Sequence, residues 1–297
     1  EPHCPQSGGS FVQMAESGVS LADEPHRGGE NTLRRLTERE NLVLGITTGI
    51  VEQVLCQPIL YWKNSRQQGL PFSLNPMLLY RGTFASVANT GVLTGVQFLA
   101  SGVFQKLIVG NEHAKVAWTQ EVTCAFLGGA ASGPFCCALE LTMIQQQRFG
   151  GSFLSTIARI AKTSGPLGFF RGLSVSTGRE ALFTAGYLGI VPATQRYCRD
   201  NYGLNPWLGN FIGATGGGLV CTAISQPLDT AKTCMQGDLT RQRYGGTLAT
   251  LKTLHKEYGS ILAVWKGYGW RSANIIFDFV ALDLLYRTFA PIMYPPV

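Results

Sequence analysis

Long apolar stretches alternate with shorter polar segments along most of this chain. Six of them follow residue 40, and each has about the 20 residues that an α-helix needs to cross a bilayer. They cover residues 41–62, 82–105, 122–147, 173–195, 201–228 and 268–289. Glu52 is the only charge in the first and Glu140 the only one in the third, while the second and fifth have none. A soluble helical bundle would need charged outer faces. The pattern therefore predicts an all-α membrane protein.

The apolar stretches form three consecutive pairs, and a shorter polar segment joins the two members of each pair. Residues 153–162 and 247–258 have the pattern of amphipathic surface helices. The corresponding segment after the first apolar stretch is shorter and contains Pro71 and Pro76. Since proline interrupts a helix, we expect this first surface helix to be truncated or absent.

Two sequence markers recur three times in alternation. In residues 225–236, SQPLDTAKTCMQ, an acid, a base and a glutamine follow Pro227 at offsets of two, five and nine. Weaker copies start at Pro58 and at Ala138. The second marker is an aromatic–basic–glycine triplet, which ends at Gly82, Gly172 and Gly267. Registered markers of this kind indicate an internal repeat.

This arrangement resembles the mitochondrial carrier family, with eroded motifs, over roughly residues 40 to 290. The resemblance implies three pseudo-symmetric repeats of two transmembrane helices around a central cavity. It also implies the mitochondrial inner membrane, with both termini toward the intermembrane space. We expect a flexible polar extension over 1–38, repeat 1 over 39–110, repeat 2 over 111–200 and repeat 3 over 201–297.

The resemblance assigns the residues after each proline position to a matrix gate, in which each acid pairs with the base of the next repeat. It implies the pairs Glu140–Lys232 and Asp229–Lys63, with Leu60 and Met143 as an uncharged third pair. Because both partners of that pair are apolar, no buried charge is left uncompensated. By the same resemblance the helix kinks are Pro58 and Pro227, and the glutamine braces are Gln67, Gln147 and Gln236. The alternative is that these charges mark helix ends facing lipid headgroups.

The opposite, cytoplasmic gate should lie near the ends of the even-numbered helices. Of the six charged positions that the family has there, only Asp283 keeps a charge. A gate so depleted argues against ordinary transport.

Substrate contacts in the family lie about seven residues after each triplet glycine. Those positions are Asn89, Arg179 and Asn274, and Glu180 follows Arg179. An Arg–acid pair resembles the branch that carries amino acids and related zwitterions such as ornithine or carnitine. Arginine binds a carboxylate through two parallel hydrogen bonds, and a glutamate can accept from an ammonium group. The alternative is that Arg179 and Glu180 pair with each other or with another helix.

Other ionisable residues inside the apolar stretches are also functional candidates. Glu52, Gln53 and Asp278 could face the cavity on this ground.

Glycines that precede helix starts are candidate lipid sites, since helix N-termini bind phosphate. The resemblance implies cardiolipin there. These glycines are Gly82, Gly151, Gly172, Gly246 and Gly267. The alternative is that they serve only as turn residues.

Composition agrees with a membrane protein and narrows the partners. Charged residues make up 14% of the chain, against about 25% in soluble proteins. The net charge is +6, but residues 1–40 sum to −3 and the remainder to +9, which favours anionic lipids. No basic stripe with interleaved aromatics points to nucleic acid. The four histidines and eight cysteines show no metal-ligand spacing, so we expect no metal and no cofactor.

Two functions remain open. The first is exchange (antiport) of a small metabolite by alternating access, in which a central site opens first to one side and then to the other. The second is a structural or accessory subunit of a larger respiratory complex, with protein partners. An enzyme is not expected, because no nucleophile–base pair or phosphate loop occurs in the sequence.

Overall fold

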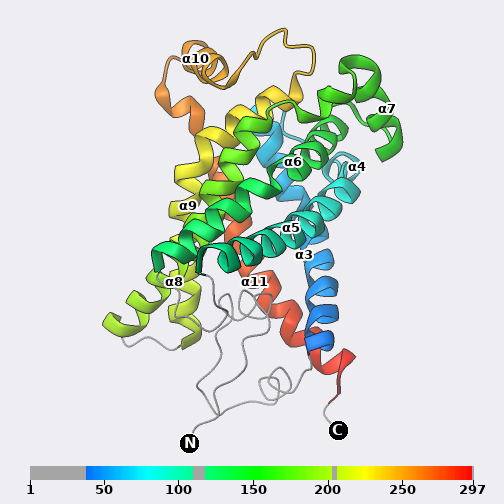
Figure 1. Ribbon diagram of the computed structural model, residues 1–297. Coiled ribbons are helices and arrows are strands. Elements are labelled where there is room, and N and C mark those ends of the chain that lie inside the picture. The colour runs from blue at the N-terminus through cyan, green and yellow to red at the C-terminus, as the bar shows by residue number, and fades with distance from the viewer. Residues whose placement is uncertain (1–37, 110–117, 203–205, 296–297) are drawn as a thin grey trace, which may run out of the picture.

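The computed structural model describes residues 38–109, 118–202 and 206–295, and the described residues form helices and no strand. The predicted extension over residues 1–38 lies almost wholly outside them. Six long helices dominate (Figure 1): α3 (Glu38–Gln68), α5 (Thr83–Val109), α6 (Trp118–Phe149), α8 (Leu173–Tyr202), α9 (Pro206–Gly237) and α11 (Tyr268–Met293). The described residues of all six predicted apolar stretches are helical apart from Gly82, and the predicted all-α fold is confirmed.

Four segments are long and apolar enough to cross a membrane by length and composition: Val43–Gln68, Pro76–Ile108, Val122–Phe149 and Trp207–Gly237. Helices α8 and α11 are of similar length, with 30 and 26 residues. They carry charges in their N-terminal halves, including Arg179, Glu180, Arg271 and Asp278. Intramembrane charges of this kind face the protein interior rather than lipid.

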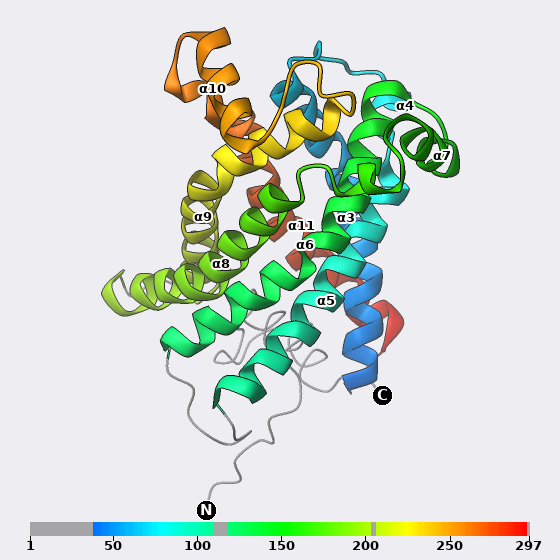
Figure 2. The ribbon, with the colours of Figure 1, turned by 45° about the horizontal axis from the view of Figure 1, so that its top comes forward.

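The six long helices close into a ring. Each packs against the next along the chain, and α11 packs back against α3. In Figure 1 the start of α3 and the end of α11 lie at one end of the molecule. The short helices α7 (Phe153–Ser164) and α10 (Thr247–Tyr258) lie at the opposite end, where Figure 2 shows them on different sides of the ring. We call this opposite end the α7/α10 end.

A hydrogen bond of the same kind recurs in all three repeats. In each, the residue before the proline position donates to the carbonyl of the basic residue in the triplet. The three bonds are Gln57 Nε2 to Arg81 O at 3.0 Å, Cys137 Sγ to Arg171 O at 3.4 Å and Gln226 Nε2 to Lys266 O at 3.0 Å. The two markers of the sequence therefore meet within each repeat, which explains why they recur together.

The triplet glycines occupy backbone conformations that few other residues adopt. Gly82, Gly172 and Gly267 have φ of 83°, 80° and 85°, in the left-handed region where glycine avoids a Cβ clash. Gly267 is the most crowded of the three. A Cβ there would lie 2.9 Å from Gln67 Cγ and 3.2 Å from the Lys63 carbonyl oxygen. The start of α11 thus depends on close backbone approach to the end of α3.

Replacing Gly267 with alanine should destabilise the protein by about 1–3 kcal/mol, since it combines a left-handed φ with a backbone contact that cannot relax. Thermal unfolding of the purified protein in detergent measures the loss. Gly95→Ala is the matched control, because nothing lies within 4 Å of its added Cβ. A melting temperature for Gly267→Ala at or above that of Gly95→Ala would contradict the packing described here.

The first repeat connects its helices differently. Its only helical element between α3 and α5 is α4 (Pro76–Leu79), four residues long. The preceding segment is fixed to the helices by aromatic contacts. Trp62 Nε1 donates to Ser73 O at 2.8 Å, and the Trp62 ring lies 5.4 Å from that of Phe72 and 4.9 Å from that of Trp270. A proline-broken loop thus stands where the second and third repeats have α7 and α10.

Candidate functional site

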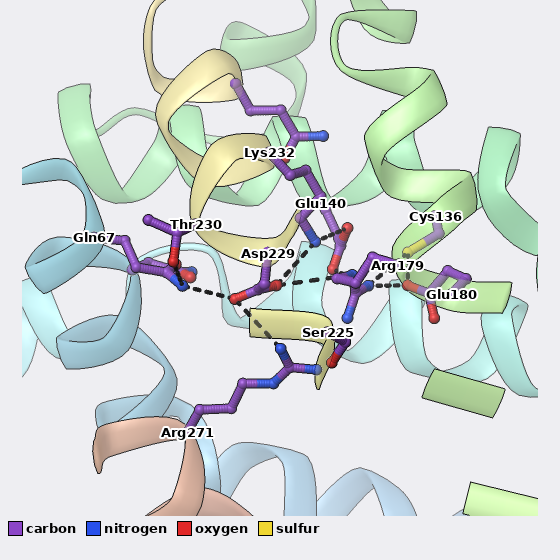
Figure 3. A network of polar contacts seen from close by, with 12 residues as sticks. Gln67, Cys136, Glu140, Arg179, Glu180, Ser225, Asp229, Thr230, Lys232 and Arg271 are labelled. Carbon is purple, nitrogen blue, oxygen red and sulfur yellow. Dashed lines mark hydrogen bonds and ion pairs between the residues drawn. The ribbon is translucent and has the colours of Figure 1, made fainter. Parts of the chain in front are cut away.

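Seven charged side chains from five helices meet in the interior of the ring, and Figure 3 labels all of them except Lys63. Each of these residues is at most 9% exposed. We call them the ring cluster: Lys63 on α3, Glu140 on α6, Arg179 and Glu180 on α8, Asp229 and Lys232 on α9, and Arg271 on α11. Buried charges are costly unless they are paired, so each of these side chains is expected to have a partner of opposite charge.

Both charged pairs expected from the sequence lie within ion-pair distance. Lys232 Nζ is 2.5 Å from Glu140 Oε2, and Lys63 Nζ is 3.1 Å from Asp229 Oδ2. At the third position Leu60 packs against the apolar cluster that contains Met143. The structure thus brings the four charged residues into two ion pairs and places the two apolar ones in one apolar cluster. Their role as a gate stays a prediction.

Asp229 is the centre of the ring cluster. Besides Lys63, its carboxylate has Lys232 Nζ at 3.5 Å, Arg179 Nε at 3.7 Å and Arg271 Nη1 at 3.9 Å. Gln67 Nε2 donates to Asp229 Oδ2 at 2.7 Å. The side chain has no exposed surface. One carboxylate therefore lies within 4 Å of all four cations of the ring cluster.

Arg179 takes part in the ring cluster instead of standing apart as a substrate ligand. Its Nη2 donates to Glu140 Oε1 at 2.9 Å and also to Glu180 Oε1. Glu180 Oε1 accepts a further hydrogen bond from Cys136 Sγ at 3.0 Å. Arg179 and Glu180 thus pair with each other, the alternative that the sequence left open. Its Nη2 is thus engaged with both glutamates, whereas its Nε is buried without a hydrogen-bond partner among the described residues.

Arg271 is a site residue to which the sequence assigned no role. It donates to Gln226 Oε1 at 3.3 Å, and its guanidinium lies 5.4 Å from the centre of the Phe183 ring. With it the ring cluster has four cations against three carboxylates. The sequence could have identified Arg271 from its position, since an arginine in an apolar stretch is a functional candidate by default.

The three brace glutamines make different contacts. Gln67 alone of the three has a hydrogen bond to a ring-cluster carboxylate among the described contacts. Gln147 accepts from Asn64 Nδ2 at 2.8 Å, and Gln236 Nε2 donates to Cys137 O at 3.3 Å. As braces of ion pairs, Gln147 and Gln236 remain predictions.

The first long helix of each repeat (α3, α6 and α9) contains a proline. Pro58 lies inside α3 and Pro227 inside α9, at the predicted positions. Helix α6 contains Pro134, four residues before the expected position at Ala138. The sequence comparison between repeats did not identify it, because it is out of register with the other two.

The two asparagines predicted to contact substrate each leave one acceptor free. The Oδ1 atoms of Asn89 on α5 and Asn274 on α11 are buried, and neither has a hydrogen-bond partner among the described residues. Asn274 Nδ2 donates to Asp278 Oδ2 at 2.5 Å. These amides therefore lie apart from the ring cluster and offer oxygen atoms to a donor.

Asp283, the predicted cytoplasmic gate residue, makes an ion pair within its own helix. Arg287 Nε lies 3.0 Å from Asp283 Oδ2, an i,i+4 pair, and Trp207 Nε1 on α9 donates to the same oxygen at 3.3 Å. Asp283 therefore has its charged partner one turn further along α11. Its role in a gate stays a prediction.

The five predicted lipid-binding glycines all precede helices. Gly82, Gly172 and Gly267 come directly before α5, α8 and α11, and Gly246 directly before α10. Gly151 is followed by Ser152, the N-cap of α7. The geometry is compatible with phosphate binding at helix N-termini, and lipid binding itself stays a prediction.

Outside the membrane-spanning helices, one ion pair fixes α10 to the loop that follows α9. Arg243 Nε and Nη2 donate to the two oxygens of Glu257 at 2.8 and 2.6 Å. These hydrogen bonds lower the pKa of the Glu257 carboxyl below its usual range. The pair lies on the surface and has no contact with the ring cluster among the described interactions.

Comparison with known proteins agrees with the geometry. The family described as "Mitochondrial carrier protein" matches residues 114–202 and 204–294. A "Tricarboxylate transporter FUM11" of Gibberella moniliformis is 23% identical over 91% of this chain and 94% of its own length. A "Probable mitochondrial 2-oxodicarboxylate carrier" of Dictyostelium discoideum is 24% identical over 77% of this chain and 82% of its own. "Mitochondrial brown fat uncoupling protein 1" of Suncus murinus is 34% identical over 38% of each chain.

Proposed function

The chain belongs to the mitochondrial carrier family, and from this membership we propose that it exchanges a small zwitterionic metabolite across the mitochondrial inner membrane. The mechanism we propose is alternating access, with an amino acid or related zwitterion as the substrate. Members of the family transport solutes without making bonds, and the residues of the ring cluster suit binding rather than bond chemistry.

The charge of the ring cluster carries this proposal. Four buried cations against three carboxylates leave one positive charge without a carboxylate of its own. Arg271 is the least engaged of the four cations. Its nearest carboxylate, Asp229, is 3.9 Å away and contacts three other cations as well. One carboxylate on a substrate would balance the cluster, because arginine can bind it through two hydrogen bonds.

The same contacts suggest how substrate opens the gate. A carboxylate that binds Arg271 and Arg179 competes with Asp229 and Glu140 for these cations. Separating buried ion pairs costs several kcal/mol, and a ligand can supply only its difference in affinity between the two states. The substrate carboxylate therefore replaces part of the lost pairing, which couples opening to binding and makes exchange the favoured mode.

The names of two relatives point to tricarboxylates and 2-oxodicarboxylates. A tricarboxylate would bring three negative charges to a cluster that has one excess positive charge. It would also meet the carboxylates of Glu52 and Asp278 elsewhere in the interior. These charges favour a substrate with one carboxylate and a cationic group, in line with the Arg179–Glu180 motif.

The remaining residues then have definite roles in our proposal. Contacts among Lys63, Glu140, Asp229 and Lys232, with the apolar pair Leu60 and Met143, close the α7/α10 end, which faces the matrix. Pro58 and Pro227 permit the helices to bend, and the three glutamines support the closed state. Asp283 is what remains of the opposite gate. Cardiolipin binds at the five helix-start glycines, and both termini face the intermembrane space.

One observation favours a second candidate, a structural subunit of a larger mitochondrial membrane complex. The loop that replaces the first surface helix exposes apolar side chains. Phe72, Leu74 and Met77 are 61%, 69% and 81% exposed. A protein partner would bury them, whereas a freely diffusing carrier has no such need.

Uptake by liposomes that contain the purified protein tests the proposal. We expect saturable exchange of ornithine or carnitine and at least a tenfold loss with Arg271→Gln, whose neutral amide cannot bind a carboxylate as an ion pair. Arg243→Gln is the control, since Arg243 pairs with Glu257 on the surface, outside the membrane-spanning helices. Exchange of citrate but of no zwitterion would overturn the substrate class. A correctly folded protein that moves none of these solutes would favour the structural subunit.

A further inference from the structure

A second polar cluster lies in the interior, between α3 and α11. Glu52 and Cys56 are one turn apart on α3, and Asp278 faces them from α11. Cys56 Sγ lies 2.9 Å from Glu52 Oε1 and 2.7 Å from Asp278 Oδ1. The sulfur and both carboxylates all lie within 4.8 Å of one another. Glu52 is 8% and Cys56 1% exposed, and Asp278 is partly buried.

This cluster has negative charge and no cation. Among the described residues, no lysine, arginine or histidine forms an ion pair with Glu52 or Asp278, although the ring cluster has an excess of cations. A thiol has one proton to donate, yet two carboxylate oxygens lie within hydrogen-bond distance of Cys56 Sγ. Like charges this close in a buried site repel each other strongly. Without a shared proton, both carboxyl groups can be ionised only when a cation binds between them.

An independent feature of the neighbouring side chain also points to a ligand. Asn274 Nδ2 donates to Asp278, which directs this amide toward the cluster, while its Oδ1 is buried without a partner. Buried amide oxygens usually have a donor, and Asn274 Oδ1 is one of several in the described residues that lack one. The site thus presents three acceptors, from Glu52, Asp278 and Asn274, and an ammonium group has three N–H donors.

The distance to Arg271 limits the ligand further. Arg271, Asn274 and Asp278 are spaced i, i+3 and i+7, so they lie along one face of α11. Seven residues correspond to about 10 Å along the helix axis. A substrate that used both ends would have its carboxylate and its ammonium group well separated. The amino group next to the carboxylate of an α-amino acid is too close to span this distance.

We propose that Glu52, Asp278 and Asn274 form a binding site for the distal ammonium group of a diamino acid. This deepens the proposed function, on which it rests: Arg271 holds the carboxylate and the α3–α11 cluster holds the side-chain amine. The site selects against neutral amino acids, which leave both carboxylates without a cation, and against tricarboxylates, which add negative charge to them.

Ligand-induced thermal stabilisation of the purified protein tests the site without requiring transport. Three probes distinguish binding of the substrate's carboxylate from binding of its distal amine. Ornithine has both groups, norvaline has the same skeleton without the distal amine, and putrescine has amines but no carboxylate. We expect ornithine and putrescine to raise the melting temperature and norvaline to have no effect at the same concentration.

Paired variants locate the effect. Glu52→Gln with Asp278→Asn removes both charges at nearly constant shape, and should weaken binding of ornithine and putrescine at least tenfold. Glu257→Gln is the matched control, because Glu257 pairs with Arg243 on the matrix-side surface, and should bind both as the wild type does. If the double variant fails to fold, each single variant should show the same weakening.

Three results would overturn the site: equal stabilisation by norvaline and ornithine, unchanged putrescine binding in the double variant, or stabilisation by Zn²⁺ that depends on Cys56 without any by putrescine. The last would identify a metal site instead.

The proposed transport function can fail independently of this site. Putrescine binding that depends on Glu52 and Asp278, without exchange in liposomes, would keep the site and reject the transporter. Ornithine exchange that is unchanged by Glu52→Gln and Asp278→Asn would keep the transporter and reject the site.

Discussion

Asp229→Asn should destabilise the purified protein by roughly 3–5 kcal/mol, the cost of leaving buried charges uncompensated. Asp229 contacts four cations, and its side chain has no exposed surface. The amide keeps the shape but removes the charge, so that Lys63 in particular loses the carboxylate 3.1 Å from its Nζ. Thermal unfolding in detergent, with the same lipid supplement for each variant, measures the effect.

Asp283→Asn provides the comparison for this result. Asp283 also pairs with an arginine, Arg287, but that side chain is 40% exposed and the pair is of the i,i+4 type. Pairs of this kind contribute about 0.3–0.5 kcal/mol. If the two substitutions lowered the melting temperature equally, Asp229 would not be the centre of a buried charge cluster.

Met143→Lys should also be strongly destabilising, by several kcal/mol (roughly 3–5). Met143 is 4% exposed and lies at the uncharged third position. Lysine there would bury a fifth cation next to a cluster that already has one cation in excess. The expected result is a large fall in melting temperature that added salt does little to relieve, because buried charges are only weakly screened.

Adding Leu60→Asp to Met143→Lys should recover most of that loss, since the new carboxylate lies where its partner is expected. The double-mutant cycle of the two single variants and the pair measures the coupling, which we expect to be about 2 kcal/mol or more. Leucine 60 already packs against the cluster that contains Met143, so the geometry permits the contact. A coupling near zero would show that these two positions do not face each other as a third pair.

The sequence could predict the helices and the charged pairs because both depend on short-range patterns. Apolar stretches of membrane length specify six helices whatever their packing. Lys63, Glu140, Asp229 and Lys232 hold fixed offsets from repeated markers, so each could be matched to its counterpart by register. The placement of Leu60 against the apolar cluster of Met143 follows from the same register, although no charge marks it.

The remainder of the site depends on tertiary packing that no repeat specifies. Arg271 belongs to no copied motif, and its nearness to Asp229 depends on how α11 packs against α9. Glu52 and Asp278 are far apart in sequence and meet only because α11 closes the ring against α3. Arg179 and Glu180 were recognised by position, but their engagement with Glu140 and Cys136 depends on the closed arrangement of α6 and α8.

Pro134 was missed because the sequence comparison relied too strictly on the repeat. The comparison between repeats assumed that a proline position keeps its register, and α6 contains its proline four residues earlier. An eroded repeat can thus retain a feature of the fold at a shifted position. The hydrogen bond from Cys137 to Arg171 O keeps the original register in this repeat, which shows that the helix-to-triplet contact does not require the proline.

Counter-exchange in liposomes tests the central claim most directly. Purified protein would be reconstituted with cardiolipin, and uptake of labelled ornithine compared between liposomes loaded with unlabelled ornithine and empty ones. The account predicts uptake at least tenfold faster into the loaded liposomes, because bound substrate replaces ion pairs of the ring cluster in both directions. Equal uptake into both, or none into either from protein with a normal melting temperature, would contradict exchange through the ring cluster.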